Sequence, residues 1–556
     1  MTTSPTRTGG RILVDQLRIQ GCDRIFTVPG ESFLAVLDAL HDTPEIETVV
    51  CRQEGGVAYM AEADGKLTGR PGVAFVTRGP GATNASPGVH VAFQDSTPMI
   101  LFVGDLDRRD KDREGFQEID FPAFFGPIAK WAARIDDARR IPEYIARAWR
   151  VATVGRPGPV VLALPEDMLR DEVEALDRPI VPPLVEHPDP AAIATVHELL
   201  KDAAAPVAIV GGADWSPCAA HHFASWANRV GLPVAAAFRR QDAVANDCAV
   251  YAGNLGYGPN PKLVERVKAA DLLLVVGARL GEATTDGYTL VTPDHPGQTI
   301  VHVHPDPNEL GRVYHADLPI CADMGEFAQA LDHWDEPDLL PFGAGAEAHA
   351  DYLAWTTPAP REGVAFDLGP CVGLLRDKLP ADTIVCNGAG NFSGWFHRYW
   401  RYAACPSQLA PTSGTMGYGL PAAVAAALRF RDRSVLCVAG DGDFLMNGQE
   451  LATAAQYGAD LLVLVVDNGS YGTIRMHQER DYPERLSATS LHNPDFAALA
   501  RAFGAWADTV DSTEAFAPAL DEALSRKGIR LLHLKTDVEV ITNQTTISAL
   551  RARAKG

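Results

Sequence analysis

The sequence predicts an α/β protein with three open, doubly wound parallel sheets, each in its own domain. Short apolar runs rich in β-branched residues alternate with longer stretches of helical composition along the 556 residues. Many runs end in glycine, as in PVAIVGG (206–212) and SVLCVAGDG (434–442). Such runs fit strands buried on both faces of a parallel sheet, with the helices as crossovers. Because the chain is too long for one hydrophobic core, we expect several domains.

Two proline-rich, weakly periodic stretches divide the chain. They cover residues 177–190 and 335–363 and have the composition of linkers. We therefore predict three domains, which cover residues 1–180, 190–335 and 362–545.

Each domain contains its own series of expected strands. They are 25–30, 72–79, 99–105 and 159–165 in the first domain, 206–212, 271–280 and 299–307 in the second, and 383–390, 434–442, 460–469 and 531–537 in the third. In sheets of this kind, ligands bind beyond the carboxyl ends of the strands, where the glycine-containing loops are expected.

Composition disfavours several classes of partner. The formal charge is −22, which disfavours binding to nucleic acid and to anionic membrane surfaces. The opening MTTSPTRTGGRILVD lacks the apolar segment of a signal peptide, and no apolar run is long enough to span a membrane. The nine cysteines show no CxxC pair or regular spacing, as expected for reduced thiols. We therefore expect a cytoplasmic protein.

Two carboxylates and two glycines stand where a buried run meets a helical stretch, in the sequence Gly440-Asp441-Gly442-Asp443. Glycines and a helix start suit a phosphate, but Asp441 would repel one unless a divalent cation lay between them. The next apolar run ends in DNGSYGT, which places Asn468 at the neighbouring strand tip. A simple turn explains GDG alone, whereas GDG paired with this asparagine favours a metal–diphosphate site.

The pair resembles the signature of thiamine-diphosphate-dependent enzymes. The resemblance implies that Asp441, Asn468 and the backbone carbonyl of Ser470 hold Mg²⁺. NGAGNFSGW aligns with an earlier diphosphate loop of the family. The further residues that the resemblance places around the cofactor are Asn391, Phe392, Gly440, Gly442, Asp443, Phe444, Tyr471, Gly472 and Thr473.

Two more motifs carry the resemblance. VVCRQEGGVAYMAEADGKLTGRPGVAFVTRGPGATN places Glu54 on the catalytic glutamate of the family, which protonates the aminopyrimidine. TSGTMGYGLPAA implies that the Gly414 carbonyl accepts from the 4′-amino group and that Met416 supports the thiazolium. The resemblance covers nearly the whole chain and is closest to the acetolactate synthase, pyruvate oxidase and 2-oxo-acid decarboxylase superfamily. It implies pyrimidine-binding, central and diphosphate-binding domains in that order, and active sites at the subunit interface of a homodimer or homotetramer.

The residues expected around the substrate depart from the acetolactate synthase pattern. Gln117 in FQEID matches an active-site glutamine, and Lys130 matches a channel-lining lysine. The arginine by which those synthases bind the acceptor carboxylate is replaced by Ala283 in RLGEA. Glu31 in VPGES matches an acidic residue beside the cofactor of decarboxylases, although a solvated loop tip is the alternative. His477 replaces a channel tryptophan and is either a proton donor or a polar lining residue.

These residues together predict an enzyme, a C–C lyase or transferase dependent on thiamine diphosphate and Mg²⁺. It would decarboxylate a 2-oxo acid donor and act on a carbonyl acceptor without a carboxylate. Acetolactate synthase, condensing two pyruvates, is the alternative, and a non-catalytic binding subunit is the alternative of another class. The resemblance leaves FAD open, because Arg279 matches a residue near flavin whereas His304 replaces the aspartate usual beside its adenosine half.

Overall fold

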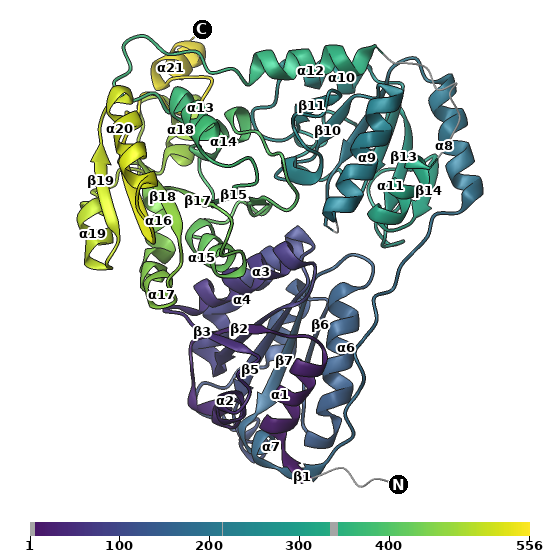
Figure 1. Ribbon diagram of the computed structural model, residues 1–556, viewed down its shortest axis with the longest axis vertical. Coiled ribbons are helices and arrows are strands. Elements are labelled where there is room, and N and C mark those ends of the chain that lie inside the picture. The colour runs from purple at the N-terminus through teal and green to yellow at the C-terminus, as the bar shows by residue number, and fades with distance from the viewer. Residues whose placement is uncertain (1–5, 214, 334–342, 556) are drawn as a thin grey trace. The chain divides into compact units, whose positions relative to one another are not determined.

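The computed structural model describes residues 6–213, 215–333 and 343–555 (Figure 1). The chain separates into two compact units. The first unit comprises residues 1–184 together with 420–431 and 447–459, and the second comprises 185–419, 432–446 and 460–556.

The first unit is built on a parallel six-stranded sheet, ordered β3-β2-β4-β5-β7-β6. Its strands are β2 (Arg24–Thr27), β3 (Glu47–Val50), β4 (Gly72–Thr77), β5 (Met99–Asp105), β6 (Trp131–Arg134) and β7 (Pro159–Pro165). Its helices are α1 (Gly9–Ile19), α2 (Leu34–His41), α3 (Glu54–Thr68), α4 (Arg78–Asp95), α5 (Phe121–Phe125), α6 (Ile141–Thr153), α7 (Glu166–Arg170), α15 (Gly419–Arg429) and α17 (Leu451–Gln456). A short antiparallel pair, β1 (Thr6–Thr8) with β8 (Glu172–Glu174), joins the two ends of this domain.

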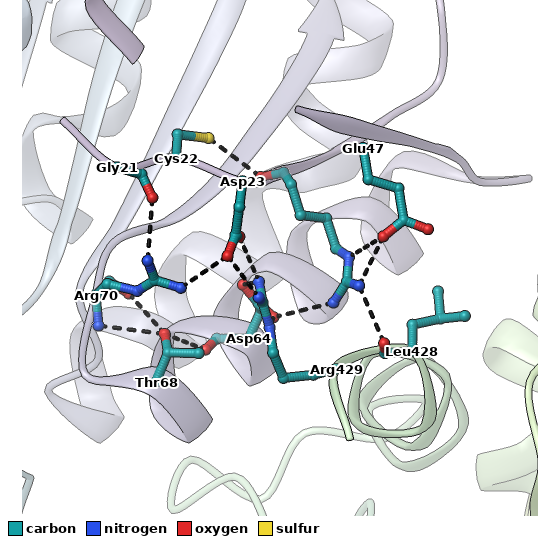
Figure 2. A network of polar contacts seen from close by, with 10 residues as sticks. Gly21, Cys22, Asp23, Glu47, Asp64, Thr68, Arg70, Leu428 and Arg429 are labelled. Atoms are coloured by element: carbon teal, nitrogen blue, oxygen red, sulfur yellow. Dashed lines mark hydrogen bonds and ion pairs between the residues drawn. The ribbon is translucent and has the colours of Figure 1, made fainter. Parts of the chain in front are cut away.

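Charged side chains attach helix α15 to this sheet, as Figure 2 shows. The Arg429 guanidinium donates to Asp64 at 2.7 and 2.8 Å and to Asp23 at 2.9 and 3.0 Å. Arg24 bonds Glu47 at 2.7 Å and the Leu428 carbonyl at 3.0 Å. Burial opposes ionisation of Asp23, but the hydrogen bond from Arg429 outweighs it and lowers the pKa of Asp23 to about 2. The C-terminal end of α15 is therefore bound firmly within the first unit.

The second unit contains two parallel six-stranded sheets, ordered β11-β10-β9-β12-β13-β14 and β16-β15-β17-β18-β20-β19. The strands of the first are β9 (Pro206–Val210), β10 (Val234–Ala236), β11 (Tyr251–Asn254), β12 (Leu272–Val276), β13 (Thr299–His304) and β14 (Leu318–Cys321). Those of the second are β15 (Ile384–Asn387), β16 (Gln408–Leu409), β17 (Val435–Gly440), β18 (Leu461–Asp467), β19 (Trp506–Val510) and β20 (Ile529–Lys535).

Helices connect the parallel strands of both sheets. Around the central sheet they are α8 (Pro190–Asp202), α9 (Pro217–Val230), α10 (Pro261–Ala269), α11 (Met324–Asp332) and α12 (Ala344–Trp355). The C-terminal sheet carries α13 (Leu368–Lys378), α14 (Ser393–Tyr399), α16 (Asp441–Asn447), α18 (Gly472–Asp481), α19 (Phe496–Ala502), α20 (Thr513–Leu524) and α21 (Ile547–Lys555). Three parallel sheets with alternating helices confirm the predicted fold class, and every expected strand is present.

Helix α12 corrects one expectation, because it lies inside the stretch that we expected to be a linker. Residues 344–355 are rich in alanine, which favours a helix. Tyr352 and Ala348 are buried, and the Tyr352 ring packs edge-on against Tyr251 with centroids 4.9 Å apart. The linker prediction was therefore wrong for this segment, while residues 334–342 lie outside the described part of the chain.

Two expectations from composition can be compared with the structure. Within the described ranges, the cysteines form no disulfide. No helix among the described residues is both long and apolar enough to cross a membrane.

The C-terminal helix α21 is bound to α18 through a buried carboxylate. Glu479 is fully buried and accepts hydrogen bonds from Arg551 at 2.6 and 2.7 Å and from Arg475 at 3.1 Å. The bonds from Arg551 are the main reason that the pKa of Glu479 falls to about 2.

Replacing Arg551 with leucine should lower the free energy of unfolding at pH 7 by roughly 1–3 kcal/mol, because a buried carboxylate loses its main partner. Since the folded pKa of Glu479 lies below its ordinary value of about 4.3, the contribution of the pair is complete above that pH. It is lost as the pH falls toward 2. Urea unfolding of both proteins between pH 7 and pH 3 measures this difference. Replacing the exposed Arg553 of the same helix with leucine is the control, and an equal effect of both substitutions would contradict the account.

Candidate functional site

Asp441 and Asn468 leave the C-terminal sheet at the same edge. Strands β17 and β18 are parallel neighbours, with Gly440 opposite Val466. Asp441 is the first residue of α16, and Asn468 directly follows β18. The predicted metal-binding side chains therefore begin at adjacent strand ends.

The glycines of this edge allow the loops to pack closely. A Cβ atom at Gly442 would lie 2.5 Å from the Tyr471 ring, and one at Gly440 would lie 2.9 Å from the Phe392 ring. Larger residues at either position would push the loops apart. The three predicted cofactor loops, 388–392, 440–444 and 468–473, thus converge at one edge of the sheet.

Hydrogen bonds reinforce this convergence. The Thr473 hydroxyl and the Asn391 side-chain oxygen are 2.9 Å apart, and the Asn391 amide donates to the Ile541 carbonyl at 3.0 Å. Phe444 is buried and packs edge-on against Phe496, with centroids 5.6 Å apart. The Phe444 side chain therefore supports the core beneath the loops.

Asn493 is a residue of this site that the sequence did not reveal. Its side-chain amide donates to Asp441 at 2.7 Å and to Asp467 at 2.7 Å. Asp467 also bonds His533 at 2.8 Å and Lys535 at 2.6 Å. Burial opposes ionisation of Asp467, but the bonds from His533 and Lys535 hold its pKa below the ordinary range, whereas burial raises the pKa of Asp441 to about 6.

The side chain of Asp443 points into the protein and joins two loops. It accepts from the Gly417 amide at 2.7 Å and the Ala389 amide at 3.2 Å, and burial raises the pKa of Asp443 to about 7. Arg239 bonds the carbonyls of Gly388, at 3.0 Å, and Pro411. The sequence predicted that Asp443 contacts the cofactor. It did not predict that Asp443 joins two loops or that Arg239 binds loop carbonyls.

The loop that contains Gly414 and Met416 lies between Pro411 and helix α15. Gly414 is exposed and has a φ of 65°, a conformation that glycine adopts without strain. Met416 is half-buried, and Gly417 is held by Asp443. The predicted acceptor and support residues are therefore on a loop anchored at its C-terminal end.

In the first unit, Glu54 is the first residue of α3. It is half-buried, and its carboxylate accepts a hydrogen bond from Asn84 at 3.0 Å. Gln53 caps the helix by accepting from the amides of Gly55 and Gly56. The carboxylate thus stands at a defined position on a capped helix end.

Glu31 and Gln117 both border the turn at Arg78. The Arg78 guanidinium lies 3.5 Å from Glu31 and 3.0 Å from Glu166, and the Gly79 amide donates to the Gln117 carbonyl at 3.0 Å. Arg78 and Gln117 have φ values of 37° and 66°, which are unusual outside glycine. Glu31 is exposed and Gln117 is half-buried, and each contacts the segment Arg78–Gly79.

The remaining expected residues are His477, Ala283, Lys130 and His304. His477 is exposed on α18, and Ala283 is half-buried after strand β12. The Lys130 ammonium donates to the carbonyls of Val154 and Arg156, both at 2.7 Å, which binds it within the first unit. The His304 ring accepts from the Asp306 amide at 3.0 Å.

The donor set around Asp441 fits a magnesium–diphosphate group. One carboxylate, one side-chain amide and one backbone carbonyl are oxygen ligands of the kind that Mg²⁺ takes together with substrate phosphates. In the described part of the chain, no cluster of three His, Cys, Asp or Glu suggests a different metal site. Within the loop, the Gly442 amide donates to the Asp441 carboxylate at 2.9 Å.

Comparison with known proteins identifies the family. Models of the thiamine pyrophosphate enzymes match residues 7–124 (N-terminal TPP binding domain), 193–331 (central domain) and 388–534 (C-terminal TPP binding domain). The acetolactate synthase large subunit of Parasynechococcus marenigrum is 34% identical over 515 residues, which cover 90% of this chain and 82% of that protein. The chain belongs to the thiamine pyrophosphate enzyme family.

Further relatives agree with this assignment. The acetolactate synthase isozyme 2 large subunit of Escherichia coli is 30% identical over 539 residues, or 95% of each protein. The acetolactate synthase large subunit of Lactococcus lactis is 29% identical over 515 residues, covering 89% of this chain and 87% of that protein. The chain is thus a thiamine pyrophosphate-dependent, acetolactate synthase-like enzyme that acts on small molecules. This result confirms thiamine diphosphate as the cofactor predicted from the sequence.

Proposed function

We propose that this thiamine pyrophosphate enzyme is an acetolactate synthase, which decarboxylates one pyruvate and joins the remaining two carbons to a second. The observation that carries the proposal is the convergence of Asp441, Asn468 and the Gly442–Tyr471 contact at one sheet edge. The names and coverage of the relatives favour two 2-oxo acids as donor and acceptor.

The proposed cofactor site contains Mg²⁺ as well as thiamine diphosphate. Asp441, Asn468 and the Ser470 carbonyl would bind the metal, and the loops around Asn391 and Gly442 would hold the diphosphate. When bound, the thiazolium serves as the electron sink for loss of CO₂ from a 2-oxo acid. Asn493 orients Asp441 through its 2.7 Å hydrogen bond, as outer partners of metal ligands do.

The protein residues supply proton transfer and orientation. Glu54 would donate a proton to the aminopyrimidine nitrogen, and the Gly414 carbonyl would accept a hydrogen bond from its amino group. Met416 would support the ring system from below. Gln117 and Glu31 would border the substrate, and His477 would act as a proton donor or line the channel.

We also propose that two or more copies of the chain share active sites, with Glu54 and Asp441 supplied by different copies. Apolar side chains close to the cofactor loops support this proposal. Leu445, Met446 and Ile474 expose 46%, 48% and 54% of their surface, which a second subunit would cover. The cytoplasmic location stays a prediction from the sequence.

One observation favours a second candidate function. Ala283 stands where the resemblance places an acceptor-binding arginine, so an ion pair with the acceptor carboxylate is missing at that position. This substitution favours a decarboxylase or a carboligase. The acceptor would then be an aldehyde, a ketone or a proton.

Incubation of the Mg²⁺- and thiamine diphosphate-loaded enzyme with pyruvate alone distinguishes the two candidates. An acetolactate synthase should form one acetolactate and one CO₂ for every two pyruvates consumed. The second candidate would release CO₂ from a panel of 2-oxo acids without acetolactate, with carboligation only after an aldehyde is added. No CO₂ release from any acid would contradict both, and a visible spectrum of the enzyme tests for FAD.

A further inference from the structure

The side chain of Glu450 lies inside the first unit, against the N-terminus of helix α3. It is fully buried at the end of a 3₁₀ turn, η6 (Gly448–Glu450). Its Oε1 accepts hydrogen bonds from the backbone amides of Arg52 at 3.1 Å and Gln53 at 3.0 Å. These amides directly precede Glu54, so one carboxylate anchors the backbone on which the proposed proton donor stands.

The two glycines after Glu54 are explained by the same arrangement. A Cβ atom at Gly56 would lie 2.6 Å from Oε1 of Glu450, and one at Gly55 would lie 2.6 Å from Oε1 of Gln53. Gln53 Oε1 accepts from both glycine amides, at 2.5 and 3.2 Å. Two side-chain acceptors therefore occupy the helix end at once, and side chains larger than hydrogen would displace them.

The remaining contacts hold Glu450 in one orientation. The Thr453 hydroxyl donates to its Oε2 at 2.5 Å. A carboxylate at a helix N-terminus also interacts favourably with the free amides and the helix dipole. Burial raises the pKa of Glu450, while the hydrogen bonds from Thr453 and the two amides oppose that shift.

We propose that Glu450 is a positioning residue for Glu54, which it orients by fixing the first turn of α3. It acts through the hydrogen bonds that it accepts from the Arg52 and Gln53 amides. The inference rests on the role of Glu54 under the proposed function. Because a displacement of about 1 Å can cost a catalytic group roughly 10²-fold in rate, loss of this anchor should be measurable.

The first test uses the full chain without cofactor. Replacing Glu450 with alanine should make the Arg52 and Gln53 amides exchange with deuterium at least tenfold faster, because both lose their acceptor. Glu450→Gln should restore protection, since its amide oxygen can replace Oε1. Mass spectrometry of the peptides that contain residues 50–58 measures the exchange.

The second test uses the enzyme loaded with thiamine diphosphate and Mg²⁺. The C2 proton of the bound cofactor should exchange for deuterium roughly 10- to 100-fold more slowly in Glu450→Ala, with cofactor affinity and the KM for pyruvate changed less than threefold. Glu450→Gln should stay within about threefold of the wild type, because it keeps the acceptor. A merely structural role would not give this rescue pattern.

Glu62→Ala is the matched control. Glu62 lies on the same helix, is also fully buried and accepts from Thr97 at 2.6 Å. The Glu62→Ala substitution should lower the free energy of unfolding. It should not change the hydrogen exchange of the Arg52 and Gln53 amides or of the cofactor C2 position. If Glu450→Ala does not fold, Gly56→Ala provides a second variant, because its Cβ would displace the same carboxylate.

Unchanged amide exchange and unchanged C2 exchange in a folded Glu450→Ala or Gly56→Ala enzyme would overturn the inference. The failure of the proposed function would look different. In that case Glu54→Gln would itself leave C2 exchange unchanged, while the amide exchange of Arg52 and Gln53 would still report whether Glu450 anchors the helix.

Discussion

The enzyme with asparagine in place of Asp441 is expected to bind thiamine diphosphate and Mg²⁺ at least about a hundredfold more weakly than the wild type. Loss of an outer partner of a metal ligand already costs roughly 10- to 100-fold, and Asp441 is proposed as a direct ligand. Asparagine keeps the size of the side chain but removes the charge that attracts the cation. Calorimetric titration of the cofactor in excess Mg²⁺ measures the affinity.

Asp508→Asn is the control for this substitution. Asp508 lies on β19 of the same sheet but is exposed, and its carboxylate accepts from the Thr509 amide. The Asp508→Asn enzyme should bind the cofactor with the affinity of the wild type. Equal affinities of the Asp441 variant and the wild type would show that Asp441 is not a metal ligand.

Replacing Glu54 with glutamine is expected to lower kcat by roughly 10²- to 10⁴-fold, the range that general acid–base catalysis contributes. The amide keeps the shape of the side chain and the contact with Asn84 but cannot donate the proton at the pyrimidine nitrogen. Cofactor affinity should change little, because the proposed diphosphate and metal contacts are made by other residues. Steady-state kinetics with pyruvate and a cofactor titration measure the two quantities.

Glu62→Gln separates this effect from a general disturbance of helix α3. It makes the same chemical change on the same helix, away from the N-terminus. Its kcat should remain close to that of the wild type. A Glu54→Gln enzyme with full activity would refute the proton transfer proposed for Glu54.

The sequence was most informative about buried strands. Runs such as β18, LLVLVVD, are buried throughout, so their apolar character is continuous and visible in the sequence. Edge strands were missed, because β6 (WAAR) is half-buried throughout and β19 (WADTV) contains two successive exposed residues, so neither forms a continuous apolar run. Helix α12 was missed because its alanine-rich segment lies between proline-rich stretches of sequence. The helix is stabilised by packing on β11, which the sequence does not show.

In the candidate site too, some residues could be predicted from the sequence and others could not. Asp441 and Asn468 could be predicted because each directly follows a recognisable strand, and parallel neighbours bring those ends together. Asn493 and Glu450 could not, since their roles depend on hydrogen bonds to residues distant in the sequence. Arg239 was missed for the same reason, because it follows strand β10 of the central sheet and bonds carbonyls in loops of the C-terminal sheet. Such supporting residues have no local sequence pattern.

A calorimetric titration of the wild-type enzyme with thiamine diphosphate, with Mg²⁺ and again with excess chelator, tests the central claim most directly. If Asp441, Asn468 and Ser470 bind the diphosphate through a cation, saturable binding of one cofactor per chain should occur with Mg²⁺ and be lost in the chelator. Equal affinity under both conditions would contradict a metal-bridged diphosphate at this edge of the sheet.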